Sequence, residues 1–233
     1  MNIFYLFITE NNQEQKQLGK FIDELNISKK CQILDLGCGY GNNIQYLQNK
    51  NNNKITGIDI NALIIDQNRK EGLDCLTVEE FEKQKEKYIE KYDVLLMCHV
   101  IEHLPSNELL DFMNYYLDCL KKGGHLIIAT PLYYSGFYDD FDHVKPYHPT
   151  GIDLVFGRRS AQVQYVARHQ LELVDIWFRK SQHKLQFFPG LYLKNKPKWP
   201  HLINLTLAIL FKASFGVIGR KTGWMGLYRK VSE

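Results

Sequence analysis

The stretch Ile33-Leu34-Asp35-Leu36-Gly37-Cys38-Gly39-Tyr40-Gly41-Asn42-Asn43 decides the fold of this chain. An apolar run ends in an acid, and three glycines at every second position then open a polar segment with helical character. A strand, a tight glycine turn and a helix N-terminus together form a pocket lined by backbone N–H groups. Because glycine has no Cβ, the turn can adopt positive φ and let a ligand approach the backbone closely. The stretch predicts a nucleotide-like ligand, although a glycine turn without a ligand is compatible with it.

The glycine spacing distinguishes between classes of ligand. A dinucleotide-binding turn reads Gly-x-Gly-x-x-Gly, but here Asn42 stands at the last of those positions and Gly41 comes one residue early. The form Asp-x-Gly-x-Gly-x-Gly instead resembles motif I of the class I S-adenosylmethionine-dependent methyltransferases. The resemblance implies S-adenosylmethionine as the cofactor. It implies cofactor contacts from Asp35, Gly37, Cys38, Gly39, Gly41, Asp59, Ile60, Cys98 and His99.

Length and composition are those of an ordinary globular chain. At 233 residues it fits one domain with insertions, and a formal net charge of +3 gives no strong signal for a nucleic-acid partner. The five cysteines include no Cys-x-x-Cys pair, which favours reduced thiols over disulfides or a zinc site. The apolar residues 1–9 are too short for a signal peptide. We therefore expect a cytoplasmic protein, with membrane association left open.

Strand and helix patterns alternate along the chain. Apolar runs at 32–36, 54–59, 72–78, 92–98 and 125–130 are separated by segments with helical spacing. This order predicts an α/β fold with a doubly wound, mostly parallel sheet. The resemblance implies the seven-stranded, Rossmann-like methyltransferase sheet with an antiparallel last strand and a C-terminal insertion. We expect an N-terminal helical cap at 1–30, the cofactor-binding core at 31–178, an apolar insertion at 179–223 and the last core strand at 224–233.

Asp59 ends the second predicted strand, about 20 residues beyond the glycine turn. A carboxylate at this place can accept hydrogen bonds from both hydroxyls of a ribose. The resemblance implies that role. The alternative is that Asp59 only caps the helix that starts at Asn61.

A first group of ionisable residues, His99-Val100-Ile101-Glu102-His103, follows the fourth predicted strand. Its letters match the inverted zinc-protease motif, but that motif needs a long helix, and Pro105 excludes one here. The segment resembles the corresponding part of the ubiquinone-biosynthesis-type small-molecule O-methyltransferases, in which Glu-x-x-Glu-His binds a divalent ion. Here His99 stands where that pattern has its first glutamate. The implied metal ligands are His99, Glu102, His103 and His143; the alternative is that Glu102 and His103 only orient the substrate.

A second group, Asp142-His143-Val144-Lys145-Pro146-Tyr147-His148, lies beyond the fifth predicted strand. Related methyltransferases carry a His-Val-x-x-aromatic segment here, and His143 matches its histidine. A neutral imidazole can accept a hydroxyl proton as the methyl group is transferred. The candidate catalytic residues are therefore His143, His103, Glu102 and His148, although a loop histidine bonded to backbone is the plainer interpretation.

The predicted insertion at 179–223 is far longer than a hairpin connection. Residues 202–218 are almost wholly apolar with one charge, Lys212, and are at the lower limit for a membrane span. Several interpretations remain open: a cap over the acceptor site, a buried helix, a helix that forms a homodimer contact, or an interfacial element at 185–221 that contacts a membrane.

These observations favour methyl transfer to oxygen on a small, lipid-like or lipid-linked, or saccharide acceptor. A metal-assisted RNA 2′-O-methyltransferase is the rival within enzymes, and it predicts a basic groove with aromatic residues. A cofactor-binding but catalytically inactive partner protein is the rival outside them.

Overall fold

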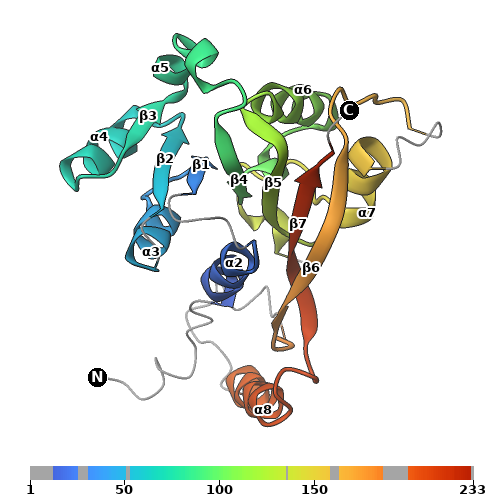
Figure 1. Cartoon of the computed structure of the whole chain (residues 1–233). Coiled ribbons are helices and arrows are strands. Elements are labelled where there is room, and N and C mark those ends of the chain that lie inside the picture. Colours follow the sequence, from blue (N-terminus) through green and yellow to red (C-terminus); the bar gives the residue numbers. More distant parts are fainter. Residues whose placement is uncertain are drawn as a thin grey trace.

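The computed structural model describes residues 13–25, 31–50, 53–134, 136–157, 163–185 and 199–231. They form one seven-stranded sheet in the order β3-β2-β1-β4-β5-β7-β6 (Figure 1). The strands are β1 Gln32–Leu36, β2 Lys54–Asp59, β3 Cys75–Thr77, β4 Tyr92–Cys98, β5 Leu120–Pro131, β6 Leu171–Ser181 and β7 Arg220–Lys230.

The first five strands run parallel, and β7 is antiparallel to both of its neighbours, β5 and β6. This confirms the predicted α/β fold and its antiparallel last strand. The strand order reverses between β1, which continues to β2, and β4, which continues to β5. In open α/β sheets ligands bind at such a switch point, beside the carboxyl ends of the strands.

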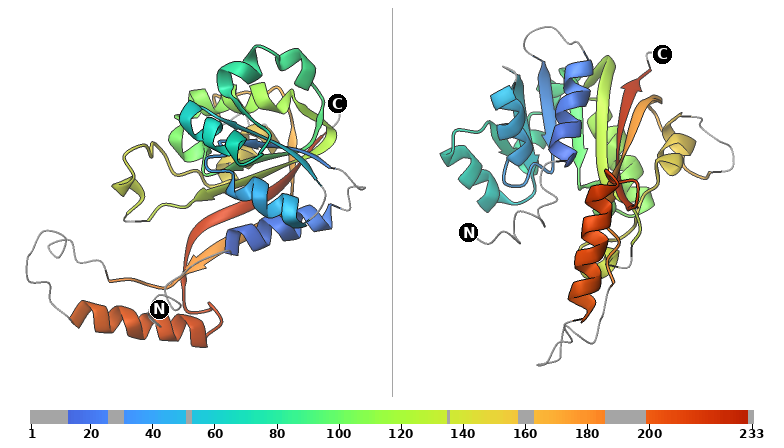
Figure 2. Two further views of the ribbon diagram at one scale, coloured as in Figure 1. Left: turned by 90° about the vertical axis from the view of Figure 1, so that its left-hand side faces the viewer. Right: turned by 90° about the horizontal axis from the view of Figure 1, so that it is seen from below.

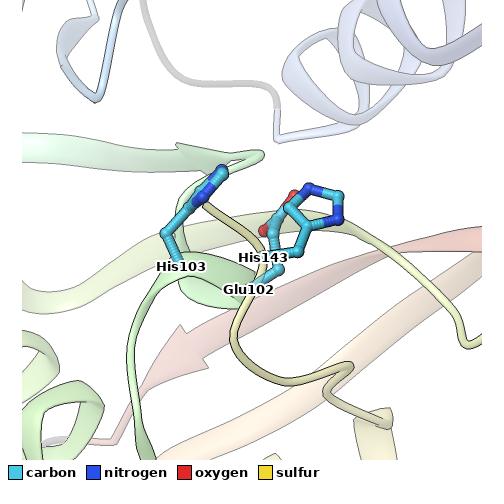
Figure 3. A group of neighbouring side chains, drawn as sticks. All are labelled: Glu102, His103 and His143. Atoms are coloured by element: carbon cyan, nitrogen blue, oxygen red, sulfur yellow. The ribbon is translucent and has the colours of Figure 1, made fainter. Parts of the chain in front are cut away.

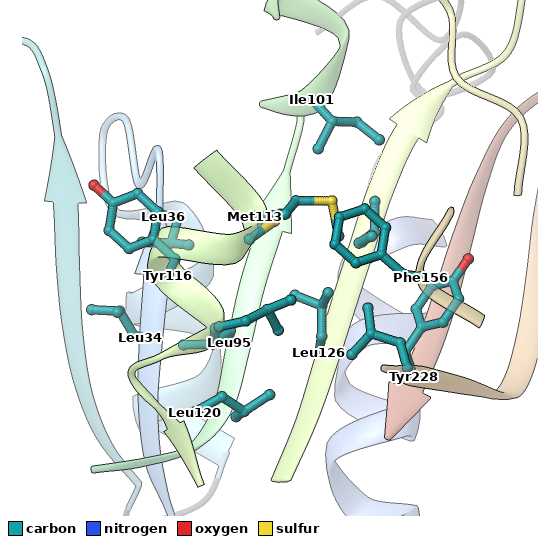
Figure 4. Close-up of a cluster of buried hydrophobic side chains, with 14 of the residues drawn as sticks. Leu34, Leu36, Leu95, Ile101, Met113, Tyr116, Leu120, Leu126, Phe156 and Tyr228 are labelled. Carbon is teal, nitrogen blue, oxygen red and sulfur yellow. The ribbon is translucent and has the colours of Figure 1, made fainter. Parts of the chain in front are cut away.

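Helices cover both faces of the sheet, and each face has its own core. On one face α2, α3 and α4 pack against strand residues such as Ile33, Val94 and Ile127. On the other, α5, α6 and α7 cover a cluster that includes Leu95 and Leu126 (Figure 4). The helices are α2 Gln13–Glu24, α3 Asn42–Lys50, α4 Ala62–Lys70, α5 Val78–Glu82, α6 Ser106–Leu117, α7 Pro149–Ile152 and α8 Trp199–Ala213, with short 3-10 turns η1 Lys85–Tyr88, η2 Ile101–His103 and η3 Phe137–Asp139, and a π turn η4 Asp153–Gly157.

The expected N-terminal cap is represented by α2, whose Leu18, Phe21 and Ile22 are buried against the sheet. Its spacing of apolar residues explains why this helix packs on one side and leaves its polar side in solvent. The rest of 1–30 lies outside the described residues, apart from Leu25, which directly follows α2.

The segment 179–223 includes the end of β6, which reaches Ser181, and the start of β7 at Arg220. Its helix, α8, lies beyond the ends of these two strands, apart from the helices that cover the sheet (Figure 2). Among the described residues no helix has the length and apolar character needed to cross a membrane.

Candidate functional site

The glycine turn after β1 is built as its sequence requires. Gly37, Gly39 and Gly41 have φ values of 69°, 49° and 72°, which lie in the left-handed region that favours glycine. The N–H groups of Gly37 and Cys38 both donate to the carbonyl of Ile58, at 2.8 and 3.0 Å. A Cβ on Gly37 would lie 2.6 Å from the side chain of Val100, so at this position close packing also favours glycine.

Asp35 lies in β1 just before this turn and is almost fully buried. Neither of its carboxylate oxygens has a hydrogen-bond partner among the described residues. Desolvation, together with the nearby Cys75 and Asp59, raises the pKa of Asp35 to about 7. Burying a carboxyl without a hydrogen-bond partner costs free energy. The Asp35 carboxyl is therefore suited to bind a cationic or hydrogen-bonding group of a ligand.

Asp59 ends β2 beside the turn. One of its oxygens accepts a hydrogen bond from the N–H of Gly39 and the other from the N–H of Asn61, both at 2.9 Å. The side chain of Asn61 itself caps α4, so the alternative that Asp59 is the capping residue is wrong. Asp59 therefore ties the turn to the end of β2, and the adjacent Ile60 is exposed at the same edge.

Cys98 ends β4, which neighbours β1, and His99 directly follows it. The thiol of Cys98 has a pKa well above its usual value, because it is buried and lies near carboxylates such as Asp35 and Glu14. His99 has a φ of 58°, an uncommon conformation for a residue with a side chain. Its N–H donates to the carbonyl of Ala129 at 2.8 Å, which fixes the bend at the end of the strand.

The imidazole of His99 is held between two glutamates. Nε2 lies 2.8 Å from Glu14 in α2, and Nδ1 lies 3.2 Å from Glu102. Burial acts to lower the pKa of His99, but the hydrogen bonds and charges of Glu102 and Glu14 outweigh it and raise this pKa to about 9. His99 is thus an imidazolium at neutral pH, with no lone pair to offer a metal.

Glu102, His103 and His143 form the cluster in which sequence-predicted residues converge (Figure 3). One potential ligand atom from each lies within 4.8 Å of the other two. Glu102 and His103 belong to the turn after β4, and His143 comes from the loop after β5. The N–H groups of Val144 and Lys145 donate to the backbone carbonyl of Glu102 and so attach the second loop to the first.

The hydrogen bonds of this cluster leave its nitrogen lone pairs available. Nδ1 of His103 is 3.0 Å from the carbonyl of Asp142, and Nδ1 of His143 is 2.6 Å from the carbonyl of Phe137. A carbonyl only accepts, so each Nδ1 carries a hydrogen, and a ring with one hydrogen then has its lone pair on Nε2. This is the tautomer of histidines that ligate metals or act as bases. Nε2 of His143 lies 3.7 Å from Oδ2 of Asp140.

Glu102 is fully buried and accepts a hydrogen bond from the hydroxyl of Thr130 at 2.9 Å. A buried carboxylate beside two imidazoles with bare Nε2 atoms is a donor set that suits a divalent transition metal. The residues present therefore fit the implied metal. Of the four predicted ligands, the structure brings together Glu102, His103 and His143 and leaves His99 outside the group.

His148 lies apart from this cluster. It is the N-cap residue of α7, where its Nδ1 accepts from the N–H of Thr150 at 3.3 Å. It also lines a cavity of about 590 Å³ bounded by α7, η4 and β6, which contains none of the other predicted site residues.

Two charged residues of this edge were not singled out from the sequence. Glu14 reaches His99, and Nη1 of Arg179 in β6 lies 2.8 Å from the same carboxylate. Their sequence separations from these partners are 85 and 165 residues, so no local pattern could have identified them.

The comparisons with known proteins agree with this geometry. A protein family described as "Methyltransferase domain" matches residues 10–196. The chain is 30% identical over 116 residues to phosphoethanolamine N-methyltransferase 1 of Zea mays, a match covering 47% of this chain and 22% of that protein. It is 33% identical over 107 residues to the ubiquinone biosynthesis O-methyltransferase of Histophilus somni (strain 2336), covering 42% of this chain and 44% of that protein.

The chain thus spans less than half the length of these two curated relatives. Among solved structures, a SAM-dependent methyltransferase from Archaeoglobus fulgidus superposes with a TM-score of 0.60 at 18% identity, covering 98% of this chain and 100% of the other. That likeness shows the shared fold. The family match over most of the chain, together with the glycine turn and the strand order, shows that this chain belongs to the class I S-adenosylmethionine-dependent methyltransferases.

Proposed function

We propose that this chain transfers the methyl group of S-adenosylmethionine to an oxygen atom of a small, lipid-like or saccharide acceptor. The observation that carries the proposal is the convergence of Glu102, His103 and His143 after the carboxyl ends of β4 and β5. A hydroxyl acceptor must lose a proton as it is methylated, and these residues offer acceptors for one.

The cofactor's place follows from the turn and its neighbours. Asp59 suits the two ribose hydroxyls, and the positive-φ glycines of the turn at 37–41 let a ligand approach the backbone closely. Asp35, buried and without a partner, suits the positively charged methionine part of the cofactor. Ile60 follows β2, Cys98 ends β4 and His99 follows it, so these three residues lie at the carboxyl ends of strands that neighbour β1.

The reaction asks for positioning and proton removal. The sulfonium already activates the methyl group, so the protein has to align the acceptor oxygen with it. His143 is the proposed base, because its Nδ1 hydrogen is committed to the carbonyl of Phe137 and its Nε2 can take a proton, whose charge Oδ2 of Asp140 at 3.7 Å would stabilise. His103 and Glu102 hold the acceptor beside it.

We propose, as the alternative role of the same His143 Nε2, that Glu102, His103 and His143 hold a divalent metal ion, in which case this nitrogen would bind the ion and would not act as the base. Such an ion would favour the ionised form of an acceptor hydroxyl. Each of the three side chains has a hydrogen-bond partner that fixes its orientation, as is common for metal ligands. Thr130 donates to Glu102, and the carbonyls of Asp142 and Phe137 accept from His103 and His143.

The α2 helix is the proposed cap of this edge. Glu14 joins it to His99 and to Arg179, so α2 is connected to both β4 and β6. In this proposal α2 belongs to an N-terminal cap, which covers the cofactor-binding core formed by residues 31–178 and the last strand.

Methylation of an amine is the second candidate, favoured by the similarity to a phosphoethanolamine N-methyltransferase. An amine acceptor needs no metal and loses its proton more readily than an alcohol. The cluster of two imidazoles and a buried carboxylate is therefore better explained by oxygen as the acceptor.

A methyl-transfer assay with matched acceptors tests the proposal. Purified protein is incubated with methyl-labelled S-adenosylmethionine and with phenols, sugars, amines or RNA, before and after treatment with a chelator. We expect transfer to hydroxyl acceptors, its loss in chelator, and its return with a divalent transition metal. Transfer to amines alone or to RNA alone would contradict the choice of acceptor. Cofactor binding without transfer to any acceptor would favour the inactive partner protein.

A further inference from the structure

The outer surface of α8 and of the residues after it is apolar and exposed. We call Leu202, Leu205, Ile209, Leu210, Phe215 and Val217 the α8 surface. Leu202 is 67% exposed, Ile209 is 56% and Phe215 is 98%. Within α8 the one buried residue is Pro200. A helix with this composition ordinarily packs into a core or against a partner.

Polar contacts hold the inner side of α8 and so fix which side faces out. The side chain of Asn204 accepts from the N–H of Leu185 at 2.7 Å and donates to its carbonyl at 3.2 Å. The ring of Phe211 lies so close to Gly219 that a Cβ there would be 2.6 Å from it. The inner side is thus attached to the ends of β6 and β7, and the apolar side is turned away from them.

Charge is distributed very unevenly along the chain. Residues 176–233 contain eleven lysines and arginines and a single acid, Glu233, whereas residues 1–175 contain 18 basic and 25 acidic residues. Among the described residues, Lys180, Lys184, Lys212 and Lys221 are exposed close to the α8 surface in sequence. An apolar surface surrounded by basic side chains is complementary to a layer of anionic lipid headgroups.

The position of α8 relates this surface to the site. β7 begins at Arg220, and its Gly223 and Trp224 pair with Pro131 and Thr130 at the carboxyl end of β5. Thr130 is the residue that donates to Glu102. α8 therefore connects to the same edge of the sheet as the proposed acceptor site.

We propose that the α8 surface docks this protein on an anionic lipid bilayer. The 15 residues of α8 give a length of about 22 Å, against about 30 Å for the hydrocarbon core, so the helix lies in the interface and does not span it. Lysines flanking the apolar side contact the headgroups, and the acidic remainder of the chain faces away from the membrane.

Nucleic acid and a second copy of the chain are less suited to this surface. An RNA partner would neutralise the lysines but leave the apolar side chains in water. A second copy would cover the apolar side chains but would bring two strongly basic segments together. A lipid surface with anionic headgroups satisfies both features at once.

Vesicle flotation of the full chain tests the proposal without cofactor or acceptor, so its outcome is separate from that of the methyl-transfer assay. We expect flotation with mixed phosphatidylcholine and phosphatidylglycerol vesicles, little with phosphatidylcholine alone, and weakening as salt is raised. Replacing both Leu202 and Ile209 by glutamine, a good helix former, should lower vesicle binding at least about tenfold. Lys184→Gln with Lys221→Gln should lower it only on the anionic vesicles.

The matched control replaces Val166 and Val174, which are exposed apolar residues elsewhere, by glutamine. This control should bind vesicles as the wild type does, and circular dichroism checks that all variants are folded. Absence of flotation at low salt, or equal flotation of the Leu202 and Ile209 variant, would overturn the proposal. A wild-type dimer in sedimentation that the same two substitutions dissociate would assign the surface to a second copy and overturn it too.

Discussion

The carboxylate of Glu14 in α2 lies 2.8 Å from Nε2 of His99, which directly follows β4, although 85 residues separate the two in sequence. The same carboxylate accepts a hydrogen bond from Arg179 at 2.8 Å. Burial acts to raise the pKa of Glu14, but its bonds and charges with His99 and Arg179 lower it overall. A carboxylate between an imidazolium and a guanidinium therefore fastens α2 to the edge of the sheet where the site lies.

Glu14→Gln should loosen this attachment. Glutamine keeps the shape but removes the charge from two charge-assisted hydrogen bonds, each of which contributes on the order of 1.5–3 kcal/mol. We expect amide hydrogen exchange in α2 to become at least about tenfold faster. Glu24→Gln is the control, because Glu24 lies in the same helix and its ion pair among the described residues is an exposed one with Lys20 at 3.5 Å. Equal exchange in the two variants would contradict a fastening role for Glu14.

Asp59→Ala should weaken the binding of S-adenosylmethionine. The variant loses the proposed partner of the ribose hydroxyls and the bond that holds Gly39, so we expect a cost of roughly 1–3 kcal/mol in calorimetric affinity. Asp66→Ala is the control, since Asp66 is exposed on α4 and, within the part of the chain that the structure describes, forms an ion pair with Arg69 at 3.8 Å. Unchanged affinity in Asp59→Ala would refute the ribose role.

Asp35→Asn should remove a pH dependence of stability. The pKa of Asp35 in the folded protein, about 7, lies above the ordinary value of 3.8, so the folded state binds the extra proton between these values. This carboxyl should therefore lower the free energy of unfolding as pH rises from about 4 to 7, by up to about 4 kcal/mol, with no further loss above that range. Urea denaturation of both proteins at pH 5 and pH 8 measures the difference. A wild-type slope that persists unchanged in the variant would place its origin elsewhere.

The fold was predictable because its signals are local. The apolar run and glycines of 33–43 specify a strand, a turn and a helix within eleven residues, and each later strand has its own apolar run. The charged segment 79–91 forms less regular structure: α5 ends at Glu82 and η1 begins at Lys85. Such short elements depend on tertiary packing more than on sequence period.

The site was predictable only in part. Residues that follow neighbouring parallel strands lie at one edge, which is why Glu102, His103 and His143 come together. The surroundings of His99 were not predictable, because Glu14 and Arg179 come from elements distant in sequence. Their charges make His99 a cation, whereas the motif alone implied a metal ligand.

The different surroundings of His143 and His148 separate two histidines that the sequence placed in one group. His143 packs against His103 with ring centres 5.0 Å apart, whereas His148 caps α7. His143→Ala should reduce methyl transfer by about 10²–10⁴-fold, the usual contribution of a positioned base, and leave cofactor affinity nearly unchanged. His148→Ala should retain transfer and lower only the stability of α7, by about 1 kcal/mol. Turnover and cofactor binding measured on both variants decide between them, since undiminished turnover in His143→Ala would remove this residue from the chemistry.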